Sequence, residues 1–267
     1  MNTAQVHGCS HFRQPPVAIP QPRVGDPLLL AVVLPPGDAR HGLPEGHLHR
    51  LTACALRAAL RRARLRLDQV DELVYACPPA QGGCSHAALE LSRLLRLPAT
   101  VPVSVVGSRS GNGLRALQLA AQSIRSGEAR CVLIAAVGGA ADDTAALVLV
   151  AADHPAARCV PPLAAIVASA GSGADPAAGT ALPTAVTRSC LERAGWERAE
   201  VTCAVQADDE DSAVGTRAYA GQATGARILL SLLDEMACRA ATRGLVTLCT
   251  GSGQGVAIAI QRRTTHP

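Results

Sequence analysis

The feature that most constrains the fold is the alternation of strand-like and helix-like segments along most of the chain. Short apolar runs that suit buried strands alternate with longer stretches whose apolar residues recur at helical spacing. This order predicts an α/β fold, a mostly parallel sheet with helices packed on it. In the first half we expect strands at 28–34, 72–76, 101–106, 131–137 and 145–150, and helices at 47–63, 85–95 and 111–126.

A second, similar set follows in the C-terminal half. Both sets close with the order strand, helix, strand, strand, over 101–150 and over 218–261, which indicates an internal duplication. We therefore expect a mobile tail at 1–26, an N-terminal half at 27–152 and a C-terminal half at 160–264. The second set has strands at 163–170, 202–206, 245–249 and 256–261, and helices at 184–194 and 224–241.

Composition excludes several classes of function. Aromatic residues make up 1% of the chain and the net charge is +4, so there is neither a stacking platform nor a basic stripe for nucleic acid. No apolar run has the length and purity of a membrane span, and the polar, proline-rich start does not resemble a signal peptide. The ten cysteines are irregularly spaced, so we expect them reduced and the protein cytoplasmic.

The N-terminal tail offers a metal-like pattern in His7, Cys9 and His11. A metal site and an unstructured tail both fit this pattern, but no second pair of ligands lies nearby at metal spacing. We expect a mobile tail, no bound metal and no resident cofactor.

Two motifs point to a known family. One is TLCTGSGQG at 247–255, a cysteine at a strand end before a glycine-rich turn; the other is SGNGL at 110–114, which opens a helix that ends at SGEA, 126–129. They resemble the C-terminal Cys-x-Gly signature and the nucleophile segment of thiolases. The resemblance extends from about residue 28 onward and implies a duplicated αβαβα five-layer fold and acyl transfer between thioesters.

The residues at the implied active positions differ from the family pattern. Ser110 stands where the resemblance implies the acyl-accepting cysteine, and a serine hydroxyl needs an adjacent base. Tyr219 stands in place of the histidine base, although a phenol with a pKa of about 10 is a poor base near neutral pH. Gln206 replaces the asparagine that fixes an oxyanion-stabilising water, and Cys249 alone is retained. Cys249 is either the base, a new acylation site or an inert packing residue.

Two regions are shorter than the resemblance implies. Only a short linker lies at 152–161, where we expect the loop domain that holds coenzyme A, and the segment 206–218 is too short for a further helix and strand. We therefore expect a fold without the coenzyme A loop domain and with a shortened C-terminal half.

Other candidates have ordinary alternatives. His86 either approaches Ser110 or caps a helix at the surface, and the acidic run 208–211 either binds a metal, clamps a substrate or is a solvated loop. Five arginines follow the first helix and either meet an acidic partner or form a solvated face: Arg57, Arg61, Arg62, Arg64 and Arg66.

Together these substitutions predict a thiolase-like protein with a degraded active site. The favoured function is a non-catalytic or regulatory partner subunit of an active thiolase or condensing enzyme. The alternative is a modified acyltransferase that uses Ser110 or Cys249 on acyl groups bound to coenzyme A or to an acyl carrier protein. Under both, we expect a homodimer, or a heterodimer with a related thiolase subunit, that pairs through the apolar strand at 101–106.

Overall fold

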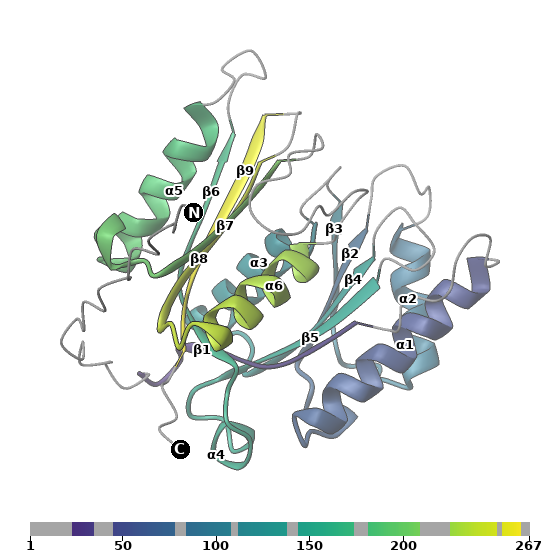
Figure 1. Cartoon of the computed structure of the whole chain (residues 1–267). Coiled ribbons are helices and arrows are strands. Elements are labelled where there is room, and N and C mark those ends of the chain that lie inside the picture. Colours follow the sequence, from purple (N-terminus) through teal and green to yellow (C-terminus); the bar gives the residue numbers. More distant parts are fainter. Residues whose placement is uncertain are drawn as a thin grey trace, which may run out of the picture.

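The computed structural model describes residues 23–34, 45–77, 84–107, 112–137, 144–173, 181–208, 225–249 and 253–262. These residues form five layers, helix on sheet on helix on sheet on helix (Figure 1). The outer helices α1 (Glu45–Arg62) and α2 (Cys84–Leu95) cover one half of the sheet, and α5 (Ala181–Ala194) covers the other. Between the two halves lie the central helices α3 (Asn112–Ser126) and α6 (Gly225–Cys238). The predicted five-layer fold is confirmed.

The described strands make one nine-stranded sheet with the order β3-β2-β4-β5-β1-β6-β9-β8-β7. The halves join at β1 and β6, where Leu28 pairs with Ala165 and Leu29 with Ala164. The strands are β1 (Pro27–Val33), β2 (Glu72–Cys77), β3 (Val103–Gly107), β4 (Cys131–Val137), β5 (Thr144–Ala151), β6 (Ala164–Gly173), β7 (Cys203–Asp208), β8 (Arg243–Cys249) and β9 (Gln254–Gln261).

The expectation of a mostly parallel sheet was wrong, because the sheet is mixed. Only β2 with β3, β2 with β4, and β7 with β8 run parallel; the other neighbours run antiparallel. β4 and β5 are joined by residues 138–143, and β8 and β9 by residues 250–253. Such short connections hold no crossover helix, so the strands that they join must be antiparallel.

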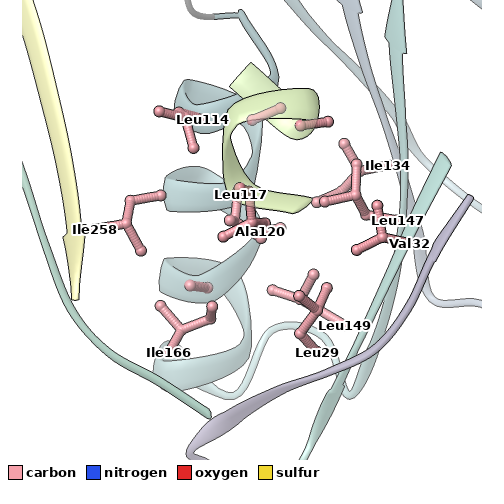
Figure 2. Close-up of a cluster of buried hydrophobic side chains, with 14 of the residues drawn as sticks. Leu29, Val32, Leu114, Leu117, Ala120, Ile134, Leu147, Leu149, Ile166 and Ile258 are labelled. Carbon is pink, nitrogen blue, oxygen red and sulfur yellow. The ribbon is translucent and has the colours of Figure 1, made fainter. Parts of the chain in front are cut away.

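The central core forms around α3. Leu114, Leu117 and Ala120 of this helix are fully buried, and Figure 2 shows them between Ile166 and Ile258 on one side and Ile134 and Leu147 on the other. Two aliphatic half-sheets therefore bury α3 between them, together with the apolar face of α6. Gly127 follows α3 with a φ of 81°, a backbone conformation that favours glycine at a helix C-terminus.

The two halves repeat the same plan, but the C-terminal half is shorter. The order β1-β5-β4-β2 matches β6-β9-β8-β7, with α1 matching α5 and α3 matching α6. Within the described residues, α2 and β3 have no counterpart, so β7 is an edge strand. The predicted loss of a helix and a strand agrees with this arrangement.

The linker between the halves contains one element that the sequence did not predict, the short helix α4 (Ala156–Cys159). His154 precedes it, is 7% exposed, and accepts a hydrogen bond at Nδ1 from the Ala156 amide at 3.2 Å. Burial, followed by the nearby Arg130 guanidinium, lowers the pKa of His154. The linker is therefore packed onto the fold, and its histidine is held neutral.

The expectation that all cysteines are reduced was wrong for one pair. Cys77 at the end of β2 and Cys84 at the start of α2 form a disulfide with a Cα–Cα distance of 6.5 Å. A strand end and the following helix start lie close enough for a bridge, which irregular spacing in the sequence does not reveal. The predicted tail falls mostly outside the described residues; residues 23–26 form a turn in which Asp26 accepts a hydrogen bond from the Arg23 amide.

Candidate functional site

The N-termini of the two central helices meet at one edge of the sheet. An ideal Cβ on Gly225 would lie 2.6 Å from the backbone nitrogen of Leu114, and one on Gly113 would lie 2.9 Å from that of Ala226. Glycine is required at both positions because the backbones approach so closely. The first N–H groups of each helix lack partners within that helix, and the helix dipoles favour negative charge at this end. The paired N-termini therefore form a place suited to a developing anion.

The segments that carry Ser110 and Tyr219 lead into these N-termini. Ser110 lies two residues before the start of α3, and Tyr219 lies six residues before the start of α6. Both residues fall outside the described part of the chain, as do residues 209–211 of the acidic run.

Cys249 lies at the same end of the sheet but faces the outer helix. It is 6% exposed and belongs to the cluster beneath α5. Its Sγ lies 3.3 Å from the position of a Cβ on Gly255, beside Leu182 and Val186 of α5. Side chains alternate along β8, so Val246 and Leu248 pack on the central cluster instead. The sulfur is thus directed away from the face that covers α3 and α6.

Gln206 also lies on the outer face of the sheet. It is the Cα partner of Thr247, whose hydroxyl lies 3.0 Å from that of Thr187 in α5. Its neighbours Cys203 and Val205 pack against the central cluster, whereas Gln206 is exposed. The side chain that we expected to stabilise an oxyanion therefore does not face α6.

Asp208 is a residue that sequence reasoning treated only as part of an acidic run. It is the last residue of β7 and the Cα partner of Cys249. The length of the paired strands would have placed Asp208 next to Cys249. If β7 is paired with β8 from Cys203 and Gly244 onward, the two strands end at Asp208 and Cys249.

His86 lies on the surface of the outer helical layer. Its side chain is 75% exposed, and Nε2 lies 3.8 Å from Oε1 of Glu90, whose other oxygen lies 3.4 Å from Nδ1 of His49 on α1. This position supports the surface alternative for His86.

The arginines in and after α1 do not surround the candidate site. Arg57 donates to the Leu94 carbonyl at the C-terminus of α2, and Arg62 donates to the Val32 carbonyl. Arg66 pairs with Asp68. The C-termini of α1 and α2 lie at the sheet edge opposite the start of α3, because α1 returns the chain to the beginning of β2 and α2 returns it to the beginning of β3, which runs parallel to β2.

Buried thiols elsewhere are poor nucleophiles. Burial raises the pKa of Cys131 to about 12 and that of Cys190 to about 11, so both stay protonated at neutral pH. No group of three or more histidine, cysteine or acidic side chains with metal-binding geometry occurs in the part of the chain that the structure describes. Within the same residues, no helix is long and apolar enough to span a membrane.

Comparison with known proteins agrees with this architecture. The family model for the thiolase N-terminal domain matches residues 31–147, and the model for the thiolase C-terminal domain matches residues 220–262. Among curated proteins, a probable acetyl-CoA acetyltransferase of Escherichia coli K12 is 41% identical over 141 residues, 45% of this chain and 36% of that protein. An acetyl-CoA acetyltransferase of Rhizobium meliloti is 37% identical over 144 residues, 46% of this chain and 37% of that protein.

Solved structures show the same fold. Human mitochondrial 3-ketoacyl-CoA thiolase in complex with CoA superposes with a TM-score of 0.77 at 14% identity, covering 90% of this chain and 99% of that one. The acetyl-CoA acetyltransferase of Bacillus anthracis gives a TM-score of 0.74 at 16% identity, covering 89% and 99%.

The duplicated α/β halves around two central helices define the class of protein as a thiolase-type scaffold. The chain belongs to the thiolase superfamily. The matched stretch spans little more than a third of the curated relatives, 36% and 37% of their lengths.

Proposed function

We propose that this chain is a thiolase-fold protein that does not complete the thiolase reaction by itself and acts as a non-catalytic or regulatory partner of an active thiolase. One observation carries the proposal: Gln206 and Cys249 face the α5 side of the sheet, whereas the paired helix N-termini lie on its other face. The two candidates that the structure describes are therefore not directed toward the place suited to an anion.

The chemistry of the substituted residues supports the same proposal. Ser110 needs a base to become nucleophilic, and the tyrosine at 219 has a pKa near 10 in the absence of perturbation. Catalytic residues that act as a unit lose most of their effect when one is removed. A scaffold with serine, tyrosine and glutamine at three of the four implied positions is therefore better suited to binding or pairing than to turnover.

The alternative is a modified acyltransferase in which Ser110 accepts an acyl group from coenzyme A or from an acyl carrier protein. The paired N-termini of α3 and α6 favour this alternative, because their N–H groups suit an oxyanion. We assign no resident cofactor or metal under either function. Most of the described cysteines are not in disulfides, which supports a cytoplasmic location.

The first experiment looks for a covalent intermediate. The purified protein is incubated with acetyl-CoA and with acetoacetyl-CoA, and intact mass spectrometry measures any added acyl group. We expect no adduct. An adduct that disappears in Ser110→Ala or in Cys249→Ala would instead establish the acyltransferase and identify its nucleophile. Cys190→Ala is the matched control, because Cys190 is a fully buried thiol in the same cluster as Cys249.

The second experiment tests the partner role directly. The chain is co-expressed with a full-length acetyl-CoA acetyltransferase from the same source, and native mass spectrometry measures mixed assemblies. We expect a mixed dimer whose thiolysis rate differs from that of the enzyme alone. If only the enzyme's own assemblies form and its rate is unchanged, the partner role is rejected.

A further inference from the structure

The Cys77–Cys84 disulfide lies outside the chemistry assigned to the candidate site. Cys77 is the last residue of β2 and is fully buried, while Cys84 is the first residue of α2 and is half-buried. The bridge closes a loop over residues 78–83, which lie outside the described residues. It therefore fixes the start of an outer helix to the end of a core strand.

This bridge borders the segment that precedes the central helix. Cys77 pairs in register with Gly107, the last residue of β3. Gly107 lies three residues before Ser110, and α3 begins two residues after Ser110. A movement of the chain between β2 and α2 would therefore occur next to the end of β3, the strand that precedes the candidate nucleophile segment.

The two sulfurs have different surroundings. Cys84 stands at a helix N-terminus, where backbone N–H groups and the helix dipole stabilise a thiolate. Cys77 is packed in the outer cluster with Leu73 and Tyr75, where a thiolate would be desolvated. Only the Cys84 side is accessible to a second thiol, and only there is a released thiolate well stabilised.

The disulfide holds a helix turn that has little packing of its own. Ser85 and His86 are exposed, and Ala87 is only partly buried. Farther along α2, Ala88, Leu91 and Leu95 are fully buried. The later turns therefore remain packed without the bridge, whereas the first turn depends on it.

We propose that Cys77 and Cys84 form a redox-controlled clasp, which a protein dithiol opens to release the first turn of α2 beside the candidate site. A thiolate of the dithiol attacks Sγ of Cys84 and forms a mixed disulfide, and the sulfur of Cys77 leaves and takes the proton of the reductant's second thiol. The second thiolate of the reductant then attacks its own sulfur in the mixed disulfide and releases the Cys84 thiolate. Two electrons pass to the protein, and the reductant becomes a cyclic disulfide.

The test follows thiols and backbone exchange in the full chain. The natively purified protein is compared with protein reduced by dithiothreitol, without denaturant. Alkylation and peptide mass spectrometry locate the new thiols, and hydrogen–deuterium exchange measures the backbone. We expect new labels only at Cys77 and Cys84, with Cys84 labelled first. Exchange should rise about tenfold in the first turn of α2 and in the segment before α3, and stay unchanged around Leu91 and Leu95.

Two variants complete the design. Cys84→Ser should show the exchange pattern of the reduced protein without any reductant. Cys54→Ser removes an exposed thiol on α1 and should behave like the wild type. If Cys84→Ser does not fold, the reduced wild-type protein still provides the comparison.

The proposal is overturned if native protein already carries both thiols free, if reduction needs denaturant, or if exchange does not change on reduction. These measurements do not depend on acyl transfer or on a thiolase partner. If the redox proposal fails, the proposed function is unaffected. If the proposed function fails, the redox proposal is unaffected.

Discussion

At the scale of single residues, burial rather than residue type decides the behaviour of the titratable side chains. His154 is packed in the linker and held neutral, whereas His86 is solvated on α2. Because burial and Arg130 lower the pKa of His154 in the folded protein, the unfolded chain binds a proton at a higher pH than the folded one does.

This difference predicts a pH dependence of stability. Above the unfolded histidine pKa of about 6.5, His154 contributes nothing to the pH dependence. As the pH falls below that value, His154 binds a proton in the unfolded state before it does so in the folded state. The free energy of unfolding therefore decreases. His154→Asn keeps an acceptor for the Ala156 amide but cannot titrate, so its stability should decline less between pH 7 and pH 5.

Urea unfolding at several pH values measures this difference. His86→Asn is the control and should keep the wild-type slope, because His86 is 75% exposed. Equal slopes for His154→Asn and the wild type would refute the assignment. The nearby carboxylates Asp71 and Asp153, which oppose the effect of Arg130, remain in both proteins.

Sequence reasoning placed two of the candidate residues in their strands but did not predict the direction of their side chains. The Cys-x-Gly motif located Cys249 at a strand end, as the structure has it. Whether its side chain faces α5 or α3 depends on strand parity, and a shift of one residue reverses the face. Gln206 faces outward for the same reason, while Asp208 ends beside Cys249. Such differences cannot be predicted from a motif alone.

At the scale of elements, the contact between α3 and α6 is the feature most sensitive to a single methyl group. Gly225→Ala would place a Cβ against the backbone of Leu114, which cannot move without shifting a central helix. We expect a loss of about 1–3 kcal/mol in the free energy of unfolding, as for other overpacked cores.

Gly244→Ala provides the matched comparison. Its Cβ would lie 2.3 Å from Sδ of Met236, which is close, but the obstacle is a flexible thioether. Rotation of the methionine should relieve most of the clash, so this variant should lose less stability than Gly225→Ala. Urea denaturation of both variants measures the two stability losses. A larger loss for Gly244→Ala than for Gly225→Ala would contradict the assigned backbone contact.

Most elements were predictable because hydrophobic periodicity is strong where helices and strands are amphipathic or buried. The predicted helix at 224–241 was too long, since α6 ends at Cys238 and Ala240 adopts a φ of 50°. Alanine has the highest intrinsic helix propensity, so the composition of this segment gave no stop signal. The short helix α4 and the disulfide depend on tertiary contacts and left no periodic pattern.

At the scale of the whole molecule, the shortened C-terminal half is adapted to its exposed edge. In the N-terminal half, the outer face of β2 carries Leu73, Tyr75 and Cys77, all buried beneath α2. The matching face of β7 carries Ala204 and Gln206, which are exposed. Small and polar side chains replace large apolar ones where no helix among the described residues covers the strand, so this face is suited to solvent.

The opposite end of the sheet has not been adapted in this way. β3 is the other edge strand, and its Val105 is 38% exposed. Leu89 on the neighbouring helix α2 is 50% exposed. An apolar edge strand with unpaired backbone groups invites pairing with another chain.

The last prediction therefore concerns assembly through β3. We expect the wild-type protein to be a dimer at micromolar concentration, either with itself or with a thiolase partner, with two β3 strands running antiparallel. Val105→Arg should give a monomer, because like charges on facing strands repel and the apolar contact is lost. Leu163→Arg replaces a similarly exposed apolar residue, 39% exposed, in the linker before β6, and it should remain a dimer. Light scattering after gel filtration distinguishes these outcomes. A monomeric wild type, alone and with the partner, or a dimeric Val105→Arg, would show that β3 is not the interface.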